Sequence, residues 1–419
     1  MTKLWSKEVL SYAFYDFANS SYALLILTFT YGLYFKSVVL QDALNADLMW
    51  GIATAVPVFI AALLSPFLGA LADHIQHKKL FLVISTLVTV ILTVLLATVD
   101  EGEVAYGMTL IILASTFYYF STLFYDAFIV DVADNHSVGK VSGFSWGLGY
   151  LGGVAALLVV APFVNKGLTP DNLSRYQFSF VLVALFFLLF ALPFFLFVKQ
   201  KIFPKNGDTL RIHVRHSFRD MVNIWRERRS HKHFLLLILA FFFYNDALST
   251  LFAFAAIFAQ FTIGMTIGEI NVALLVMQLI AFPAAWFFGT LSDILGHKPL
   301  ILTTLSMILV FSGVAAFAES KYLFVAALWL AALGIGAAQS CTRALIRTMI
   351  PEDRSAHFFG FQSFLGKFSA FLGPLIFGYL SSAYQNQRIA FLTVPVFLIV
   401  GMVLLWFVKA PVLEETLIH

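Results

Sequence analysis

Five ionisable side chains stand inside long apolar stretches of the 419-residue chain: Asp16, Asp126, Asp246, Arg343 and Lys367. Charged groups within membrane segments are costly, so they usually face one another or a pathway for a solute or ion. Counted at about 1.5 Å of helical rise per residue, Asp16, Asp126 and Arg343 lie at similar depth, and the other two lie deeper. The depths favour pairing Asp246 with Lys367, and either shallower acid with Arg343. Alternatively, such pairs only hold helices together.

Polar and aromatic neighbours accompany these charges. Asn19 follows Asp16 by three residues and Gln339 precedes Arg343 by four, so each pair shares one face of a helix. A tyrosine stands close to each acid, as a candidate wall of a binding pocket: Tyr15, Tyr125 and Tyr244. A carboxylate in a poorly hydrated cavity takes up a proton more readily than one in water, as proton coupling requires. An arginine stays charged and can hold a carboxylate through two hydrogen bonds.

Other motifs in the chain do not support catalysis. Residues 143–147 fit the pattern Gly-x-Ser-x-Gly, and residues 147–152 fit Gly-x-Gly-x-x-Gly. Both chemistries need a strand that turns into a helix, whereas these residues lie within one apolar helix. Gly143 with Gly147, and Gly149 with Gly153, instead have the spacing that lets helices approach closely. We therefore expect no enzyme activity, no cofactor and no bound metal.

The composition predicts that the elements carrying these residues cross a bilayer. Hydrophobic residues make up 60% of the chain and charged residues only 12%, against about 25% charged in soluble domains. The net charge of +3 gives no reason to expect a nucleic-acid partner. A spanning helix needs about 20 apolar residues, and the chain offers twelve such stretches. They are 9–37, 48–72, 79–99, 105–133, 141–163, 177–199, 233–261, 269–292, 299–318, 322–349, 356–383 and 389–409.

The second half of the chain repeats motifs of the first. Gly69-Ala-Leu-Ala-Asp73 recurs as Gly289-Thr-Leu-Ser-Asp293, and Phe14-Tyr15-Asp16 recurs as Phe243-Tyr244-Asn245-Asp246. Two six-helix bundles related by pseudo-symmetry are the simplest explanation. We expect an all-α membrane protein with bundles 1–199 and 233–419. A basic cytoplasmic linker, 200–232, joins them, and its second half is either a surface helix or a solvated loop.

Lysine and arginine placement predicts the orientation in the membrane. With the N-terminus inside, twenty of these residues fall in cytoplasmic segments and five on the opposite side. The five are Lys36, Lys166, Arg175, Lys321 and Arg388. Because basic residues concentrate on the cytoplasmic side, both termini should face the cytoplasm. The first apolar stretch is longer than a signal-peptide core, so we expect it to be retained as a span.

The repeated motif after the second span resembles the signature loop of the major facilitator superfamily, Gly-x-Leu-Ala-Asp-Arg-x-Gly-Arg-Lys-Lys. Here it runs from Gly69 through Asp73 to Lys78 and Lys79, with histidines at the two arginine positions and Gln76 at the second glycine. The copy in the second half keeps that glycine. The resemblance implies a gating role for the conserved positions of both copies. These are Gly69, Asp73, Lys78, Gly289 and Asp293.

Within the superfamily the chain resembles the vacuolar effluxer family, which includes autophagy-related vacuolar amino-acid exporters. The likeness rests on Tyr15-Asp16-Phe17-Ala18-Asn19-Ser20, on Gly149-Tyr150-Leu151-Gly152-Gly153, and on Gln339-Ser340-Cys341-Thr342-Arg343. Asp126 departs from the family, which has an asparagine there. The resemblance implies that spans one, four, seven and ten line a central cavity, and that the substrate is an amino acid.

The sequence therefore predicts a secondary active transporter that moves an amino acid or similar small zwitterion by alternating access, coupled to protons or another ion. The alternatives are an antiporter that exports an amphipathic drug or other metabolite, and a non-transporting membrane receptor. We expect a monomer in the lipid bilayer of a bacterial inner membrane.

Overall fold

The computed structural model describes residues 6–75, 77–133, 138–200, 232–349, 366 and 368–409. Across these residues the secondary structure is helical, without strands. Eleven helices in this part of the chain are long and apolar enough to span a membrane, which confirms the all-α membrane fold. Of the expected span 356–383, residues 356–365 and 367 lie outside the described residues, and α15 (Leu372–Tyr384) forms its second part.

The long helices of the first half follow the predicted spans closely, with short elements between them. They are α1 (Lys7–Ser21), η1 (Tyr22–Phe29), α2 (Thr30–Tyr34), η2 (Phe35–Val39), α3 (Ala46–Ile75), α4 (Lys78–Leu95), η3 (Leu96–Thr98), α5 (Val104–Asp126), α6 (Ile129–Val132), α7 (Val138–Val164), η4 (Pro170–Asn172) and α8 (Leu173–Phe197). One expected span was too long: the stretch 105–133 breaks after Asp126 and resumes as α6.

The second half begins with one continuous helix where the first half has four consecutive segments. Its elements are α10 (Lys232–Phe261), α11 (Ile267–Leu295), α12 (His297–Phe317), α13 (Lys321–Thr348), α15, α16 (Gln387–Phe391) and α17 (Thr393–Trp406). The predicted linker 200–232 lies outside the described residues except at its two ends, so the division into two domains stays a prediction.

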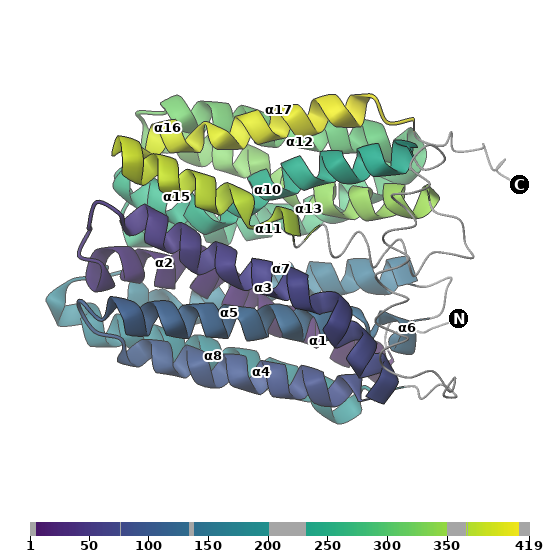
Figure 1. Cartoon of the computed structure of the whole chain (residues 1–419), viewed down its shortest axis with the longest axis horizontal. Coiled ribbons are helices and arrows are strands. Elements are labelled where there is room, and N and C mark those ends of the chain that lie inside the picture. The colour runs from purple at the N-terminus through teal and green to yellow at the C-terminus, as the bar shows by residue number, and fades with distance from the viewer. Residues whose placement is uncertain are drawn as a thin grey trace, which may run out of the picture.

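The helices of each half of the chain pack together. In Figure 1 the purple and blue helices α1 to α8 lie side by side, and the green and yellow helices α10 to α17 lie above them. The two groups touch where α3 meets α15 and where α7 meets α11. Large apolar side chains such as Leu63, Leu189 and Val403 remain exposed, as expected of helices that face lipid.

The first span departs from a regular helix at η1 and η2, which are π-helical. The hydroxyls of Thr28 and Thr30 donate to the carbonyls of Ala23 and Leu25, five residues earlier in each case. A π-helix carries its backbone hydrogen bonds at that same spacing. The wider turns begin directly after Ser21, between Asp16 and the far end of the span.

Candidate functional site

Asp16 of α1 is the centre of a polar cluster in the first half. The Tyr125 hydroxyl of α5 donates to Asp16 Oδ2 at 2.9 Å, and Asn19 Nδ2 donates to Asp16 Oδ1 at 3.3 Å. The Ser20 hydroxyl donates to the Asp16 carbonyl at 2.8 Å. Asp16 itself is only half-buried. Both carboxylate oxygens thus accept a hydrogen bond from a neighbouring side chain.

A stack of tyrosine rings encloses one side of this cluster. Tyr12 and Tyr15 stack on the two sides of Tyr125, with ring centroids 4.4 and 4.8 Å away. The Tyr12 carbonyl lies 3.2 Å from the same Tyr125 hydroxyl, as a second acceptor for its one proton. Tyr15 is completely buried, and its hydroxyl shares a 2.7 Å hydrogen bond with Thr86 of α4. Tyr15 therefore packs α1 against α4, and its hydroxyl is not directed at Asp16.

Asp246 of α10 has very different surroundings. Its side chain is fully buried, and Oδ1 accepts the backbone N–H of Gly373 at 2.7 Å, at the start of α15. Oδ2 is buried without a hydrogen-bond partner among the described residues. The neighbouring Tyr244 hydroxyl bonds Thr342 of α13 at 2.7 Å, so Tyr244, like Tyr15, joins two helices.

The remaining predicted site residues are placed only in part. Asp126 is the last residue of α5, and its side chain is exposed. Gln339 is half-buried on α13. The side chain of Arg343 and the whole of Lys367 lie outside the described residues. The pairings of Asp246 with Lys367, and of Asp16 or Asp126 with Arg343, therefore stay predictions.

The predicted gating residues belong to helices rather than loops. Gly69 and Asp73 lie within α3, which continues to Ile75, and the second copy lies within α11, which continues to Leu295. The side chains of all four residues, Gly69, Asp73, Gly289 and Asp293, lie outside the described part. An apolar run followed by a motif of mixed polarity indicates where a helix emerges from the membrane, but not where it ends.

Lys78 makes its contacts within the first half. It is buried at the start of α4, pairs with Asp131 of α6, and donates to the Ala127 carbonyl at 3.1 Å. Its ammonium also lies 4.6 Å from the centroid of the Phe128 ring. Lys78 thus fastens the short helix α6 to α4. Asp131 was not among the predicted residues, because it lies within the expected span 105–133 and no lysine stands near it in the sequence.

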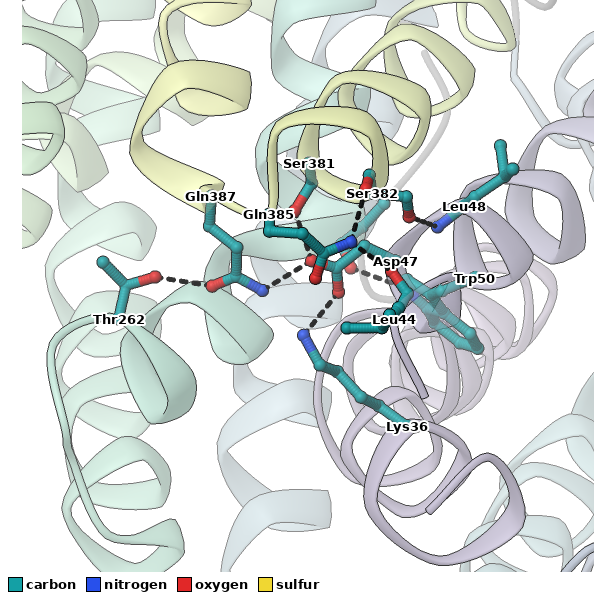
Figure 2. A network of polar contacts seen from close by, with 11 residues as sticks. Lys36, Leu44, Asp47, Leu48, Trp50, Thr262, Ser381, Ser382, Gln385 and Gln387 are labelled. Carbon is teal, nitrogen blue, oxygen red and sulfur yellow. Dashed lines mark hydrogen bonds and ion pairs between the residues drawn. The ribbon is translucent and has the colours of Figure 1, made fainter. Parts of the chain in front are cut away.

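A second buried polar group lies at the opposite end of the helices, and the sequence did not predict it. Figure 2 shows Asp47 in contact with Lys36 from its own half and with Ser381 and Gln387 from the second half. We call Lys36, Asp47, Thr262, Ser381 and Gln387 the Asp47 cluster. Lys36 was counted only as a charge at the end of the first span. Its burial follows from the neighbouring half, which no local pattern reveals.

The sequence also matches that of known proteins. A profile of the family described as Vacuole effluxer Atg22 like matches residues 48–412. The chain belongs to this family. The MFS-type transporter YxiO of Bacillus subtilis is 26% identical over 423 residues, which cover 99% of this chain and 97% of that protein. Autophagy-related protein 22 of Kluyveromyces lactis is 24% identical over 284 residues, which cover 62% of this chain and 56% of that protein.

Solved structures share the fold of this Atg22-like chain. A D-xylose-proton symporter superposes with a TM-score of 0.73 at 14% identity, over 97% of this chain and 98% of the symporter. The nucleoside transporter NupG superposes with a TM-score of 0.70 at 14% identity, over 96% and 99% of the two chains. With the relationship to YxiO, these likenesses identify a multi-pass membrane transporter of the major facilitator type.

Proposed function

We propose that this Atg22-like protein is a secondary active transporter that moves an amino acid or a similar small zwitterion by alternating access, with proton coupling. One observation carries the proposal. Equivalent helices of the two halves, α1 and α10, each hold an acid, and the two acids have opposite surroundings. Asp16 is half-buried with both oxygens hydrogen-bonded, whereas Asp246 is fully buried with one oxygen lacking a partner among the described residues.

The half-buried acid suits substrate binding. A carboxylate held by a phenol and an amide keeps its charge, and charge-assisted hydrogen bonds to an ammonium group are the strong ones. Asp16 with Tyr125 and Asn19 would therefore hold the amino group of a zwitterion. The predicted partner for the substrate carboxylate is Arg343.

The fully buried acid suits proton uptake. An ionised carboxylate out of water is costly unless it is paired, and a proton removes that cost. Asp246 receives one backbone N–H from Gly373, and the Thr250 hydroxyl beside it is directed to the Asp246 carbonyl at 2.8 Å. Proton release would require new solvation or a cation such as the predicted Lys367. Movement of α15 away from α10 would supply such a change.

Flux in proteoliposomes with an imposed pH gradient tests the proposal. We expect saturable amino-acid flux that responds to the gradient, tested beside nucleosides, sugars and amphipathic cations. Asp16→Asn should raise KM roughly tenfold or more, because a hydrogen bond to a charged group contributes about 1.5–3 kcal/mol. Asp246→Asn should retain substrate exchange and lose the response to the pH gradient.

Asp171→Asn is the matched control, because Asp171 is exposed in η4. It should behave like the parent protein. Full pH dependence in Asp246→Asn would refute the coupling role of that residue. Flux of bulky amphipathic compounds without amino-acid flux would favour the alternative, an exporter of drugs or other metabolites. No flux of any solute would favour the receptor.

A further inference from the structure

The Asp47 cluster begins with an ion pair inside the first half. Lys36 Nζ lies 2.6 Å from Asp47 Oδ1, and both side chains are buried. The two residues flank the short connection between the first and second spans, so one half of the protein supplies both charges. Asp42 in that connection also faces Lys36. Burial raises the pKa of Asp42, and the Lys36 ammonium opposes that rise.

The other oxygen of Asp47 faces the second half. Ser381 Oγ of α15 donates to Asp47 Oδ2 at 2.5 Å, and Gln387 Nε2 of α16 donates to the same oxygen at 2.8 Å. One carboxylate oxygen of Asp47 therefore contacts the first half of the protein, and the other accepts hydrogen bonds from the second half (Figure 2). Hydrogen bonds to an ionised acceptor are stronger than those between neutral groups.

Thr262 determines which way the Gln387 amide points. The Thr262 hydroxyl, just after α10, donates to Gln387 Oε1 at 2.6 Å. A hydroxyl donor at the amide oxygen leaves the amide nitrogen directed at Asp47. Lys36 also reaches across, with its ammonium 4.2 Å from the centroid of the Phe261 ring. The second half thus surrounds the ion pair with an arranged set of neighbours.

Backbone contacts accompany these hydrogen bonds. A Cβ added at Gly378 would lie 2.5 Å from the Asp47 carbonyl oxygen, and one at Gly51 would lie 2.5 Å from that of Pro374. Glycine lets α3 and α15 touch directly, as small residues do between membrane helices. The indole of Trp50 donates to the Ala253 carbonyl of α10 at 2.7 Å. At this end the two halves are in close contact.

Contacts at the other end of the helices have a different character. Lys79 Nζ donates to the Val198 carbonyl at 2.7 Å, within the first half. Lys298 Nζ donates to the carbonyls of Trp406 and Val408 at 2.7 and 2.8 Å, within the second. Each of these bonds stays intact if the halves rotate against one another, whereas the bonds to Asp47 Oδ2 do not.

We propose that the Asp47 cluster is a latch that holds this end of the protein closed. Opening breaks the bonds from Ser381 and Gln387 to Asp47. It also breaks the bonds from the Leu48 N–H to Ser382 Oγ at 3.1 Å, from Gln385 Nε2 to the Leu44 carbonyl at 3.0 Å, and from Trp50 to Ala253. The proposal rests on the alternating access put forward above. Lys36 and Asp47 belong to the same half, so their ion pair stays intact when the two halves separate at this end. Neither charge is then left unpaired in the membrane. Only neutral donors are exchanged for water. Thr262 acts as a positioning residue for Gln387.

The latch is tested by a distance across the closed end, which requires neither substrate nor flux. Spin labels are placed at Leu44→Cys and Tyr384→Cys, both exposed, after replacement of the single cysteine by Cys341→Ser. Double electron–electron resonance in lipid nanodiscs then gives the populations of short and long distances. Ser381→Ala with Gln387→Ala should raise the ratio of open to closed molecules roughly a hundredfold, because each of the two lost hydrogen bonds contributes on the order of a factor of ten.

Matched controls separate the latch from a general loss of packing. Gln177 lies at the same end but bonds Tyr34, Val99 and Asp100 of its own half. Ser306 is exposed on α12, and its hydroxyl donates to the Leu302 carbonyl of the same helix at 2.8 Å. Gln177→Ala with Ser306→Ala should therefore leave the distances unchanged. Thr262→Val should give a smaller shift than the double variant, and Thr262→Ser should give none.

A double-mutant cycle tests whether Asp47 is the shared acceptor. Lys36→Met with Asp47→Leu removes both charges and keeps similar volume. In that background, Ser381→Ala with Gln387→Ala should add no further shift. Unchanged distances in the double variant, or equal shifts in the control, would overturn the latch. Because the readout is a distance, either result is independent of whether amino acids prove to be the substrate.

Discussion

Asp16 and Asp246 hold corresponding positions in the repeat, yet their neighbours give them different chemistry. Asp16 receives side-chain donors from Tyr125 and Asn19, and it keeps partial access to solvent. Asp246 receives one backbone N–H from a glycine and is fully enclosed. Sequence motifs alone make these acids equivalent. The difference comes from which helix crosses each one, α5 over Asp16 and α15 over Asp246.

Removing the Tyr125 hydroxyl should weaken substrate binding without disturbing the fold. Tyr125→Phe keeps the stacked rings and loses the hydrogen bond to Asp16 Oδ2, so the carboxylate is less well positioned. We expect substrate affinity to fall roughly two- to tenfold with little change in maximal flux, measured by binding titration and transport kinetics. Tyr22→Phe is the matched control. Tyr22 also stacks on a tyrosine, with ring centroids 4.6 Å apart, but bonds Ser115.

An affinity loss of the same size in Tyr22→Phe would indicate a packing effect and contradict the positioning role of Tyr125. Thermal unfolding of the two variants should be alike, because each loses one buried hydroxyl and no ring.

Among the elements, α7 and α15 are equivalent in the two halves, because glycines let each of them approach the helix that carries the acid. A Cβ at Gly152 would lie 2.2 Å from the Phe17 carbonyl of α1, one residue from Asp16. One at Gly373 would lie 2.9 Å from Asp246 Oδ1. Each helix therefore lies directly against the acid of its half. Of the predicted glycine pairs, Gly147, Gly149 and Gly153 lie close to another helix, as expected. The prediction was wrong for Gly143, where an added Cβ would meet nothing within 4 Å.

The contact between α3 and α15 should respond to a single methyl group. Gly378→Ala would place a Cβ against the Asp47 carbonyl. Because this carbonyl belongs to the backbone of α3, it can move aside only at a cost in free energy. Overpacking of this kind costs roughly 1–3 kcal/mol, so the ratio of open to closed molecules should rise roughly five- to a hundredfold in the spin-label measurement.

Gly313→Ala on α12 is the control for that substitution, because an added Cβ there meets nothing within 4 Å. Both variants gain the helix propensity of alanine, so propensity alone cannot separate them. A closed-end distance that stays short in Gly378→Ala would show that α3 and α15 tolerate separation without opening.

At the scale of the whole molecule, the two halves repeat a contact that the motif did not predict. Lys79 and Lys298 are the second residues of α4 and α12, and each donates to carbonyls at the end of the last helix of its half. Cations suit helix C-termini because these ends carry partial negative charge. The basic residues that predict a cytoplasmic face therefore also join one helix of each bundle, α4 or α12, to the end of the last helix of that bundle.

Labelling from the two sides of the membrane tests the predicted orientation. Leu44 lies at the end that carries the Asp47 cluster, and Lys199 is exposed just after α8. In the Cys341→Ser background, Leu44→Cys should react with an impermeant maleimide in intact cells. Lys199→Cys should react only in inverted vesicles, because basic segments face the cytoplasm. The reverse pattern would contradict an orientation with both termini inside.

The positions of the spanning helices could be predicted from the chain because each depends on a local run of apolar residues. Predicted and observed bounds agree within a few residues for most spans, as with 233–261 against Lys232–Phe261. The repeat and the acids of α1 and α10 could also be identified from the sequence. The error at 105–133 arose because the helix is interrupted at Ala127 and Phe128, two apolar residues that keep the hydrophobicity of the stretch high.

What only the tertiary structure shows is which side chains meet. Asp47 and Gln387 are 340 positions apart, and nothing near either residue in the sequence indicates that they bond. Tyr15 and Tyr244 stand close to acids along the chain, yet their hydroxyls bond Thr86 and Thr342. Helical spacing limits each side chain to one face, and the neighbour on that face depends on how the two bundles pack. That packing joins Lys36 and Asp47 of one half to the donors of the other.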